Sequence, residues 1–335
     1  MRTAVIGAGN FGTVIANILA RNGCETYLWL RDEQQLQDML RERENRRYLP
    51  GHKLVDSVQP TSDLDLAASS SELLFVTVPS ESFREVAQAM SEYVTPGAYV
   101  VSGTKGVEAT PFQLMSQIVK DEIEHAVVGV LSGPNLAEEI AAGQFAGTVI
   151  ASEDEKLVAV VQEHLQSSRF RIYGNSDVYG VELGGALKNI YAIICGMATT
   201  LQVGQNALAM VMTRSLAEMN RFAQSMGANA MTFLGLSGVG DLIATCTSPH
   251  SRNFQLGSQL AQGRSLDEAQ EKLGKLAEGV NTLKVVYQKK EELDVYMPLV
   301  DGAYRVLFRK ENMLAVIGEL MTSQQQPDVE STISD

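Results

Sequence analysis

The sequence predicts an α/β protein with an N-terminal parallel-sheet domain of the Rossmann type and an all-α C-terminal domain. A GxGxxG motif follows a short apolar strand and directly precedes a helix, which is the context in which this motif binds dinucleotides. Short apolar strands then alternate with helical segments up to about residue 177, a pattern typical of a parallel sheet covered by helices. From about Val178, Ala-, Met- and Leu-rich segments with helical spacing predominate.

The predicted elements follow this alternation in order. Apolar runs predict strands at residues 3–6, 26–30, 73–78, 98–102, 126–131, 149–151 and 170–173. Helical spacing predicts helices at residues 13–21, 33–44, 111–119 and 155–166. We expect a dinucleotide-binding domain over residues 1–178, a helical catalytic domain over 179–325 and a polar tail over 326–335. No Pro-rich or Gly/Ser-rich linker separates the two domains, so we expect them to pack together.

Composition excludes several classes of protein. The net charge of -13 over 335 residues argues against nucleic-acid binding, because phosphate backbones attract clustered Lys and Arg. Cys24, Cys195 and Cys246 are widely spaced and form no CxxC pair, which argues against disulfides or zinc and suits a reducing cytoplasm. The N-terminus lacks a signal peptide and no uninterrupted apolar run could span a membrane, so we expect a cytoplasmic protein. The charged runs at residues 41–47 and 288–293 are interpreted as solvated helix faces.

The three glycines of the motif have separate expected roles. Gly7 permits a tight turn, Gly9 lets backbone N–H groups approach a pyrophosphate, and Gly12 permits close packing of the helix. Asn10 and Phe11 are expected to line the turn. Either a nicotinamide or a flavin dinucleotide fits this pattern.

The end of the second strand bears on the choice of dinucleotide. Arg31 could bind a 2′-phosphate, whereas the adjacent Asp32 could bind a ribose 2′-hydroxyl. A solvated surface arginine is the alternative for Arg31. The sequence therefore leaves NAD and NADP equally open.

Two further turns follow predicted strands, at the sheet edge where open α/β proteins bind ligands. One carries Lys105 between two glycines. The other, residues 132–135, contains Gly133 and Asn135 and can contact a cofactor or substrate with free N–H groups and short side chains. An ordinary helix cap is an equally good interpretation of this second turn.

A lysine on an apolar helix is the candidate acid–base residue. Residues 182–194 have helical apolar spacing, yet they include Gly184, Gly185, Lys188 and Asn189. Paired glycines indicate that a ligand or another helix approaches this backbone closely. Lys188 either extends to solvent or, with its pKa lowered by desolvation, exchanges protons with a substrate.

Two segments of the second half suggest an anion site. Asp241 follows a glycine-rich loop at a predicted helix start, where it could be an N-cap, a polar site residue, or both. Ser251, Arg252 and Asn253 begin another predicted helix, whose N–H groups, guanidinium and amide suit a phosphate. The four histidines show neither a catalytic context nor metal-ligand spacing, so we expect no metal.

The segments GAGNFGT, SGTKG, LSGPN, ELGGALKNIYAI, GVGDLIATC, SRN and KLAEGV together resemble the bacterial NAD(P)-dependent glycerol-3-phosphate dehydrogenase family. The resemblance implies a C-terminal domain similar to that of 6-phosphogluconate dehydrogenase. It also implies reversible reduction of dihydroxyacetone phosphate to sn-glycerol 3-phosphate with NADH or NADPH. A homodimer that supplies glycerol phosphate for phospholipid synthesis is expected on the same basis.

The resemblance also implies roles for individual residues. Lys188 is the implied catalytic residue, and the implied substrate contacts are Lys105, Gly133, Asn135, Lys188, Asp241, Ser251, Arg252 and Asn253. Beside the three glycines, the implied cofactor contacts are Asn10, Phe11, Arg31, Lys105, Ala137, Arg252, Leu276 and Glu278. Asn135 stands where serine or threonine is common in the family, and Leu276 where valine is. The active site is expected in a cleft between the domains.

Two other functions remain compatible with the glycine motif. A reductase of the same fold class could act on a hydroxy acid or on ketopantoate, but it would not need the phosphate site at Ser251 to Asn253. A non-catalytic dinucleotide sensor would not need Lys188.

Overall fold

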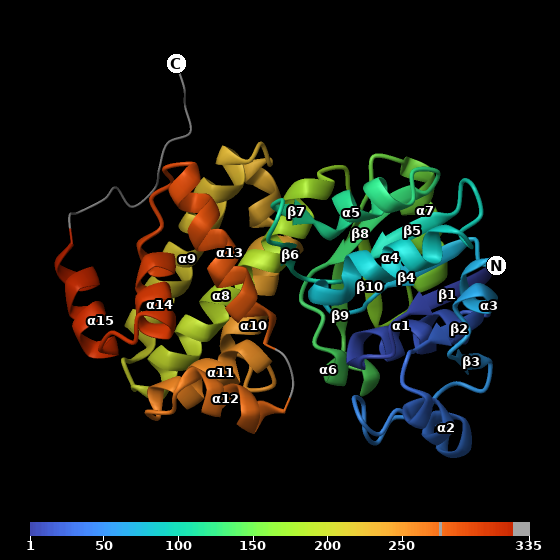
Figure 1. The fold of residues 1–335 in the computed structure, drawn as a ribbon, viewed down its shortest axis with the longest axis horizontal. Coiled ribbons are helices and arrows are strands. Elements are labelled where there is room, and N and C mark those ends of the chain that lie inside the picture. The colour runs from blue at the N-terminus through green and yellow to red at the C-terminus, as the bar shows by residue number, and fades with distance from the viewer. Residues whose placement is uncertain (275–276, 324–335) are drawn as a thin grey trace. The chain divides into compact units, whose positions relative to one another are not determined.

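The computed structural model describes residues 1–274 and 277–323, in which the chain forms two compact units (Figure 1). Unit 1 comprises residues 1–182 and unit 2 begins at Leu183. Helix α8 (Val178–Thr200) starts in the last residues of unit 1 and continues into unit 2. The predicted tail at residues 326–335 lies outside the described residues.

Unit 1 contains an eight-stranded sheet with the strand order β10-β9-β8-β5-β4-β1-β2-β3. The strands are β1 (Arg2–Ile6), β2 (Glu25–Trp29), β3 (Val58–Thr61), β4 (Leu73–Val76), β5 (Tyr99–Ser102), β8 (Val127–Ser132), β9 (Ala146–Ala151) and β10 (Phe170–Asn175). In register, Ile6 pairs with both Trp29 and Val76, so the neighbouring strands β4, β1 and β2 end at one level. The turns that follow them therefore share one edge of the sheet.

Two strands, β9 and β10, depart from the predicted parallel sheet, since β10 runs parallel to β9. β9 runs antiparallel to β8, with Leu131 opposite Ile150. The connection between them contains only the five-residue helix α6 (Ala137–Ala141), which spans about 7 Å. Neighbouring parallel strands are usually joined by a longer crossover helix, which this connection does not contain.

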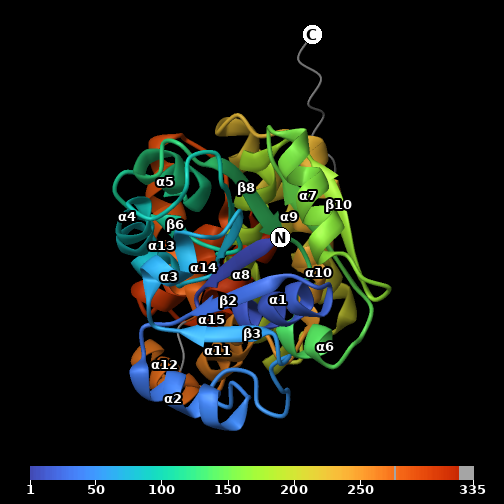
Figure 2. The same ribbon diagram turned by 90° about the vertical axis from the view of Figure 1, so that its right-hand side faces the viewer.

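Helices cover both faces of this sheet, and alternate residues of each strand face opposite cores (Figure 2). Val5, Leu28 and Phe75 belong to the core beneath α1 and α7, whereas Ile6 and Val76 belong to the core beneath α3, α4 and α5. The helices are α1 (Asn10–Arg21), α2 (Glu33–Glu42), α3 (Leu64–Ala68), η1 (Ser80–Ser82), α4 (Phe83–Ser91), α5 (Met115–Glu122) and α7 (Glu155–Leu165). Burial on both faces explains why these strands are continuous apolar runs.

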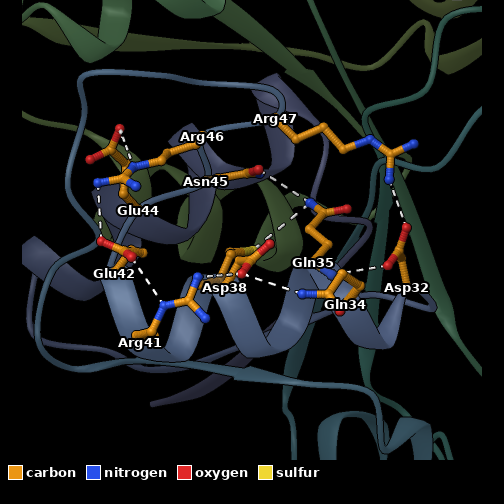
Figure 3. Close-up of a pocket in the computed structure, with 11 residues that line it drawn as sticks. Asp32, Gln34, Gln35, Asp38, Arg41, Glu42, Glu44, Asn45, Arg46 and Arg47 are labelled. Carbon is orange, nitrogen blue, oxygen red and sulfur yellow. Dashed lines mark hydrogen bonds and ion pairs between the residues drawn. The ribbon is translucent and has the colours of Figure 1, made fainter.

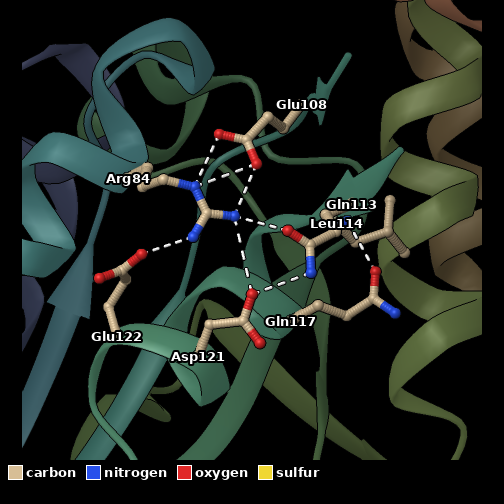
Figure 4. A network of polar contacts seen from close by, with 7 residues as sticks. All are labelled: Arg84, Glu108, Gln113, Leu114, Gln117, Asp121 and Glu122. Carbon is tan, nitrogen blue, oxygen red and sulfur yellow. Dashed lines mark hydrogen bonds and ion pairs between the residues drawn. The ribbon is translucent and has the colours of Figure 1, made fainter. Parts of the chain in front are cut away.

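The helix predicted over residues 111–119 begins only at Met115. The residues before it form a two-stranded hairpin, β6 (Val107–Glu108) and β7 (Gln113–Leu114). Arg84 of α4 holds both strands, since its Nε donates to Glu108 at 2.9 Å and its Nη2 donates to Gln113 (Figure 4). These long-range contacts outweigh the local helical spacing.

The described residues of unit 2 are helical, and no strand occurs among them. After α8 come α9 (Gln205–Ser225), η2 (Ala230–Leu234), the π-helical turn η3 (Leu236–Gly240), α10 (Asp241–Thr247), α11 (Arg252–Ala261), α12 (Leu266–Leu273), α13 (Glu278–Glu292), α14 (Pro298–Phe308) and α15 (Met313–Thr322). Among the described helices, α8 alone is long and apolar enough to cross a membrane, and most of it is buried inside the protein. A core helix of a folded protein has the same composition.

Candidate active site

Close packing alone explains two of the three glycines in the turn between β1 and α1. Gly7 has φ +118°, and a Cβ there would lie 2.9 Å from the carbonyl carbon of Thr77. A Cβ on Gly12 would collide with the Gly7 carbonyl oxygen and with Thr77 Oγ1. A Cβ on Gly9 would meet no described atom within 4 Å. The glycine at position 9 therefore fits a role in ligand approach, as a dinucleotide pyrophosphate requires.

Two side-chain amides, of the buried Asn45 and the partly buried Gln35, hold this turn in place. Asn45 donates from Nδ2 to the Ala8 carbonyl at 2.9 Å and to Thr13 Oγ1 at 2.8 Å, and Gln35 Nε2 donates to the same carbonyl at 3.1 Å. Asn45 has no exposed surface. The interpretation of residues 41–47 as a solvated helix face is therefore wrong at Asn45. The interpretation of residues 288–293 is likewise wrong at Lys290, which is buried and paired with Asp301.

Arg31 and Asp32, at the end of β2, are both engaged in ion pairs. Arg31 pairs with Glu85 at 3.2 Å, and both side chains are exposed. Asp32 caps α2 by accepting from the Gln35 N–H at 2.9 Å, and it also pairs with Arg47 at 2.6 Å. The Gln35 N–H, followed by Arg47, lowers the pKa of the Asp32 carboxyl. Asp32 and Arg47 line a charged pocket along α2 (Figure 3).

The turns after β5 and β8 meet at the carboxyl edge of the sheet. Lys105 Nζ donates to the Gly133 carbonyl oxygen at 2.9 Å. Asn135 is not a helix cap, because Leu136 occupies the N-cap position of α6; instead its Nδ2 donates to Thr148 Oγ1 at 2.9 Å. The structure therefore brings Lys105, Gly133 and Asn135 together as the sequence predicts. Thr148 was not predicted, since nothing local to its strand marks it.

The glycine turn and the Lys105 turn are also neighbours. A Cβ on Gly103, at the end of β5, would lie 3.3 Å from the ring of Phe11. Asn10 Oδ1 accepts from the Phe11 N–H at 2.9 Å. Phe11 is therefore placed between the two turns that the sequence assigned to the dinucleotide.

In unit 2, Lys188 is buried and ion-paired. Its Nζ donates to Asp241 Oδ1 and to Thr245 Oγ1 of α10, and Thr245 Oγ1 also donates to Asp241 at 3.3 Å. Lys188 does not extend to solvent, because only 7% of its side chain and 1% of that of Asp241 are exposed. Thr245 was missed, although a residue four positions after Asp241 lies on the same helix face.

The segments around Lys188 and Asp241 decide between the alternatives that the sequence left open. Asp241 is the first residue of α10 and Gly240 its N-cap, so Asp241 is not the cap. The preceding turn, η3, is π-helical, a geometry that occurs often at functional sites. A Cβ on Gly184 would lie 2.8 Å from the Ser237 carbonyl oxygen, so the chain itself approaches this glycine.

The predicted phosphate residues do begin a helix, α11. Ser251 is its N-cap and accepts from the Phe254 N–H at 3.3 Å, and Arg252 is exposed. Asn253 is buried: its Nδ2 donates to Asn189 Oδ1 at 3.0 Å and its Oδ1 accepts from the Gly279 N–H at 3.0 Å. Asn253 of α11 therefore joins α8 to α13. Its partner in α8, Asn189, directly follows Lys188 in the sequence.

The remaining cofactor residues are at helix starts or outside the structure. Ala137 is the first residue of α6 and Glu278 the first of α13. Leu276 lies outside the described residues. No group of three or more His, Cys, Asp or Glu side chains suited to a metal ion occurs within residues 1–274 and 277–323.

Comparisons with known proteins agree across the whole chain. Residues 2–158 match the model for the N-terminus of NAD-dependent glycerol-3-phosphate dehydrogenase, and residues 177–318 match the model for its C-terminus. The NAD(P)+ glycerol-3-phosphate dehydrogenase of Teredinibacter turnerae is 52% identical over 330 residues, which are 98% of this chain and 97% of that protein. That of Azotobacter vinelandii is 53% identical over 327 residues, 98% and 96% of the two chains. The crystal structure of glycerol-3-phosphate dehydrogenase from Coxiella burnetii has a TM-score of 0.92 and 34% identity, covering 96% of this chain and 99% of that one.

Proposed function

The chain belongs to the NAD-dependent glycerol-3-phosphate dehydrogenase family, and we propose that it reduces dihydroxyacetone phosphate reversibly to sn-glycerol 3-phosphate with Lys188 as its acid–base residue. The family, the two-part fold and the class of NAD(P)-dependent oxidoreductase predicted from the sequence are confirmed. The roles of individual residues remain predictions.

The buried Lys188–Asp241–Thr245 cluster is the observation that carries the proposal. When bound, the reduced nicotinamide supplies the hydride that the ketone carbon accepts. Lys188, as ammonium, donates a proton to the oxygen that becomes negative, and in the reverse direction the neutral amine removes the hydroxyl proton. Asp241 and Thr245 orient the amine for this transfer, since both accept from Nζ.

The cofactor site that we propose is the turn of unit 1. Gly9 leaves space for close approach, while Asn45 and Gln35 fix the Ala8 carbonyl beside it. The N-terminus of α1 favours the pyrophosphate charge. Arg31 and Asp32 offer a cation for a 2′-phosphate and a carboxylate for a 2′-hydroxyl, so either NADH or NADPH fits.

The substrate site that we propose needs positive charge in an acidic protein. Lys105 lies against Gly133 near Asn135, and Arg252 begins α11 beside the cap residue Ser251. A guanidinium at a helix N-terminus suits a phosphate dianion. Asn253, which is buried and whose amide bonds to Asn189 and Gly279 inside unit 2, would contribute chiefly by holding α11 in place.

Localisation and assembly are further parts of the proposal. All three cysteines are free and buried, which suits a reducing cytoplasm. We infer a homodimer that supplies glycerol phosphate for phospholipid synthesis. Light scattering coupled to gel filtration measures the oligomeric state directly.

Two substitutions test the reaction. Lys188→Ala is expected to bind NADH by fluorescence titration as the wild type does while losing at least 10³-fold in kcat, which is within the range for loss of an acid–base residue. Turnover close to that of the wild type would reject Lys188 in this role. Arg252→Ala is expected to raise KM for dihydroxyacetone phosphate, and an unchanged substrate KM would reject Arg252 as a phosphate ligand.

A further inference from the structure

The turn after β8 contains an amide whose orientation is settled by its neighbours. Thr148 of β9, which has no exposed surface, donates from Oγ1 to the Ser132 carbonyl oxygen at 3.0 Å. A carbonyl can only accept, so the one hydroxyl hydrogen of Thr148 is committed there. Thr148 Oγ1 can therefore only accept from Asn135, whose Nδ2 lies 2.9 Å away. The amide oxygen of Asn135 must point elsewhere.

Thr148 also packs against Gly133, which lies between Ser132 and Asn135 in the sequence. Gly133 has φ +146°, and a Cβ there would lie 3.1 Å from Thr148 Cα and 3.2 Å from its Oγ1. Thr148 thus contacts Ser132, Gly133 and Asn135, which makes it the residue that positions this turn. Its place on β9, next to the Val149 that pairs with Ser132, follows from the antiparallel register.

Two buried polar atoms of the turn lack a partner among the described residues. They are Asn135 Oδ1 and Ser132 Oγ. Leaving such an atom unsatisfied destabilises the folded protein, so each needs an explanation, and a bound ligand is one. Lys105 Nζ binds the Gly133 carbonyl between them, which places both atoms in the turn expected to hold substrate.

From these contacts we propose that Asn135 Oδ1 accepts a hydrogen bond from the free hydroxyl of the bound triose phosphate, and that Thr148 is the positioning residue that holds the amide in this orientation. This inference rests on the proposed function. An amide oxygen repels phosphate oxygens, which are acceptors at neutral pH. Asn135 Oδ1 therefore binds a hydrogen-bond donor of the substrate and not its phosphate. The carboxamide of nicotinamide also carries an N–H donor, and the experiment separates the two sources.

The test compares two substrates in matched variants. Hydroxyacetone phosphate replaces the hydroxymethyl group of dihydroxyacetone phosphate by a methyl group and so lacks the donor. Asn135→Leu removes the acceptor, Thr148→Val releases the amide, and Thr148→Ser keeps the hydroxyl. Thr26→Val is the matched control, because this buried strand threonine pairs with Thr3 at 3.0 Å in the first residues of β1 and β2.

The measured quantity is the ratio of kcat/KM for dihydroxyacetone phosphate to kcat/KM for hydroxyacetone phosphate. Sites built to bind a hydroxyl reject analogues that lack it by large factors. We expect the ratio to fall at least tenfold in Asn135→Leu and Thr148→Val, through loss of activity on dihydroxyacetone phosphate alone. Thr148→Ser and Thr26→Val are expected to keep the wild-type ratio.

One result would overturn the inference: an unchanged ratio in Asn135→Leu while the enzyme still reduces dihydroxyacetone phosphate. This outcome is distinct from failure of the proposed reaction. If that variant also has a reduced preference for NADH over its 3-acetylpyridine analogue, which lacks the N–H donor, Asn135 is assigned to the cofactor instead. If Thr148→Val does not fold, Asn135→Leu decides with the same two substrates.

Discussion

Replacing either Lys188 or Asp241 alone is expected to lower the free energy of unfolding more than replacing both. With 7% and 1% of the two side chains exposed, neither charge can be solvated when its partner is lost. Removing one member of such a buried pair costs about 3–5 kcal/mol, whereas apolar replacement of both is often nearly neutral. Lys188→Met and Asp241→Leu are therefore each expected to lose about 4 kcal/mol. The double variant is expected to lose far less than the sum of about 8 kcal/mol.

Urea unfolding measures this cycle. With a slope of about 2 kcal/mol/M, each single variant should lower the unfolding midpoint by about 2 M. Circular dichroism at 222 nm follows the helices of both units, while the single tryptophan, Trp29 of β2, reports on unit 1 alone. Losses that add in the double variant would show that the two groups do not interact, and would refute the buried pair.

Three further outcomes follow from the geometry. Gly9→Ala is expected to keep the wild-type melting temperature but to weaken NADH binding at least tenfold in a fluorescence titration. Gly12→Ala, whose Cβ would collide with the backbone of the same turn, is expected to have a lower melting temperature by calorimetry. Burial raises the pKa of Glu218 to about 8 from 4.5. Between these two pH values the folded state keeps a proton that the unfolded state loses, so the free energy of unfolding should fall as pH rises from about 4.5 to 8. The urea midpoint of Glu218→Gln is expected to change less with pH than that of the wild type. Arg31→Ala is expected to raise KM for NADPH more than for NADH in steady-state assays, and equal increases would contradict a 2′-phosphate contact.

Features that depend on neighbours along the chain could be predicted. The alternation of strands and helices and the strand–turn–helix context of Gly7 to Gly12 both follow from local patterns. The position of Lys105 at a strand end and the start of α11 at Arg252 were predicted for the same reason. Lys188 was chosen as the acid–base candidate because its neighbours on the helix are apolar, which is also a local property, whereas its burial was decided by the structure.

Features that depend on distant partners appeared only in the tertiary structure. Asn45 meets Ala8 across 37 residues and Thr245 meets Lys188 across 57, so neither pairing leaves a local signal. The antiparallel direction of β9 depends on its pairing with β8, and the hairpin before α5 depends on Arg84. Periodicity therefore determined which apolar residues are buried, because their burial repeats along an element. The burial and the hydrogen-bond partners of polar residues such as Asn45 were decided by folding, because a buried polar group binds whichever donor or acceptor the fold brings to it.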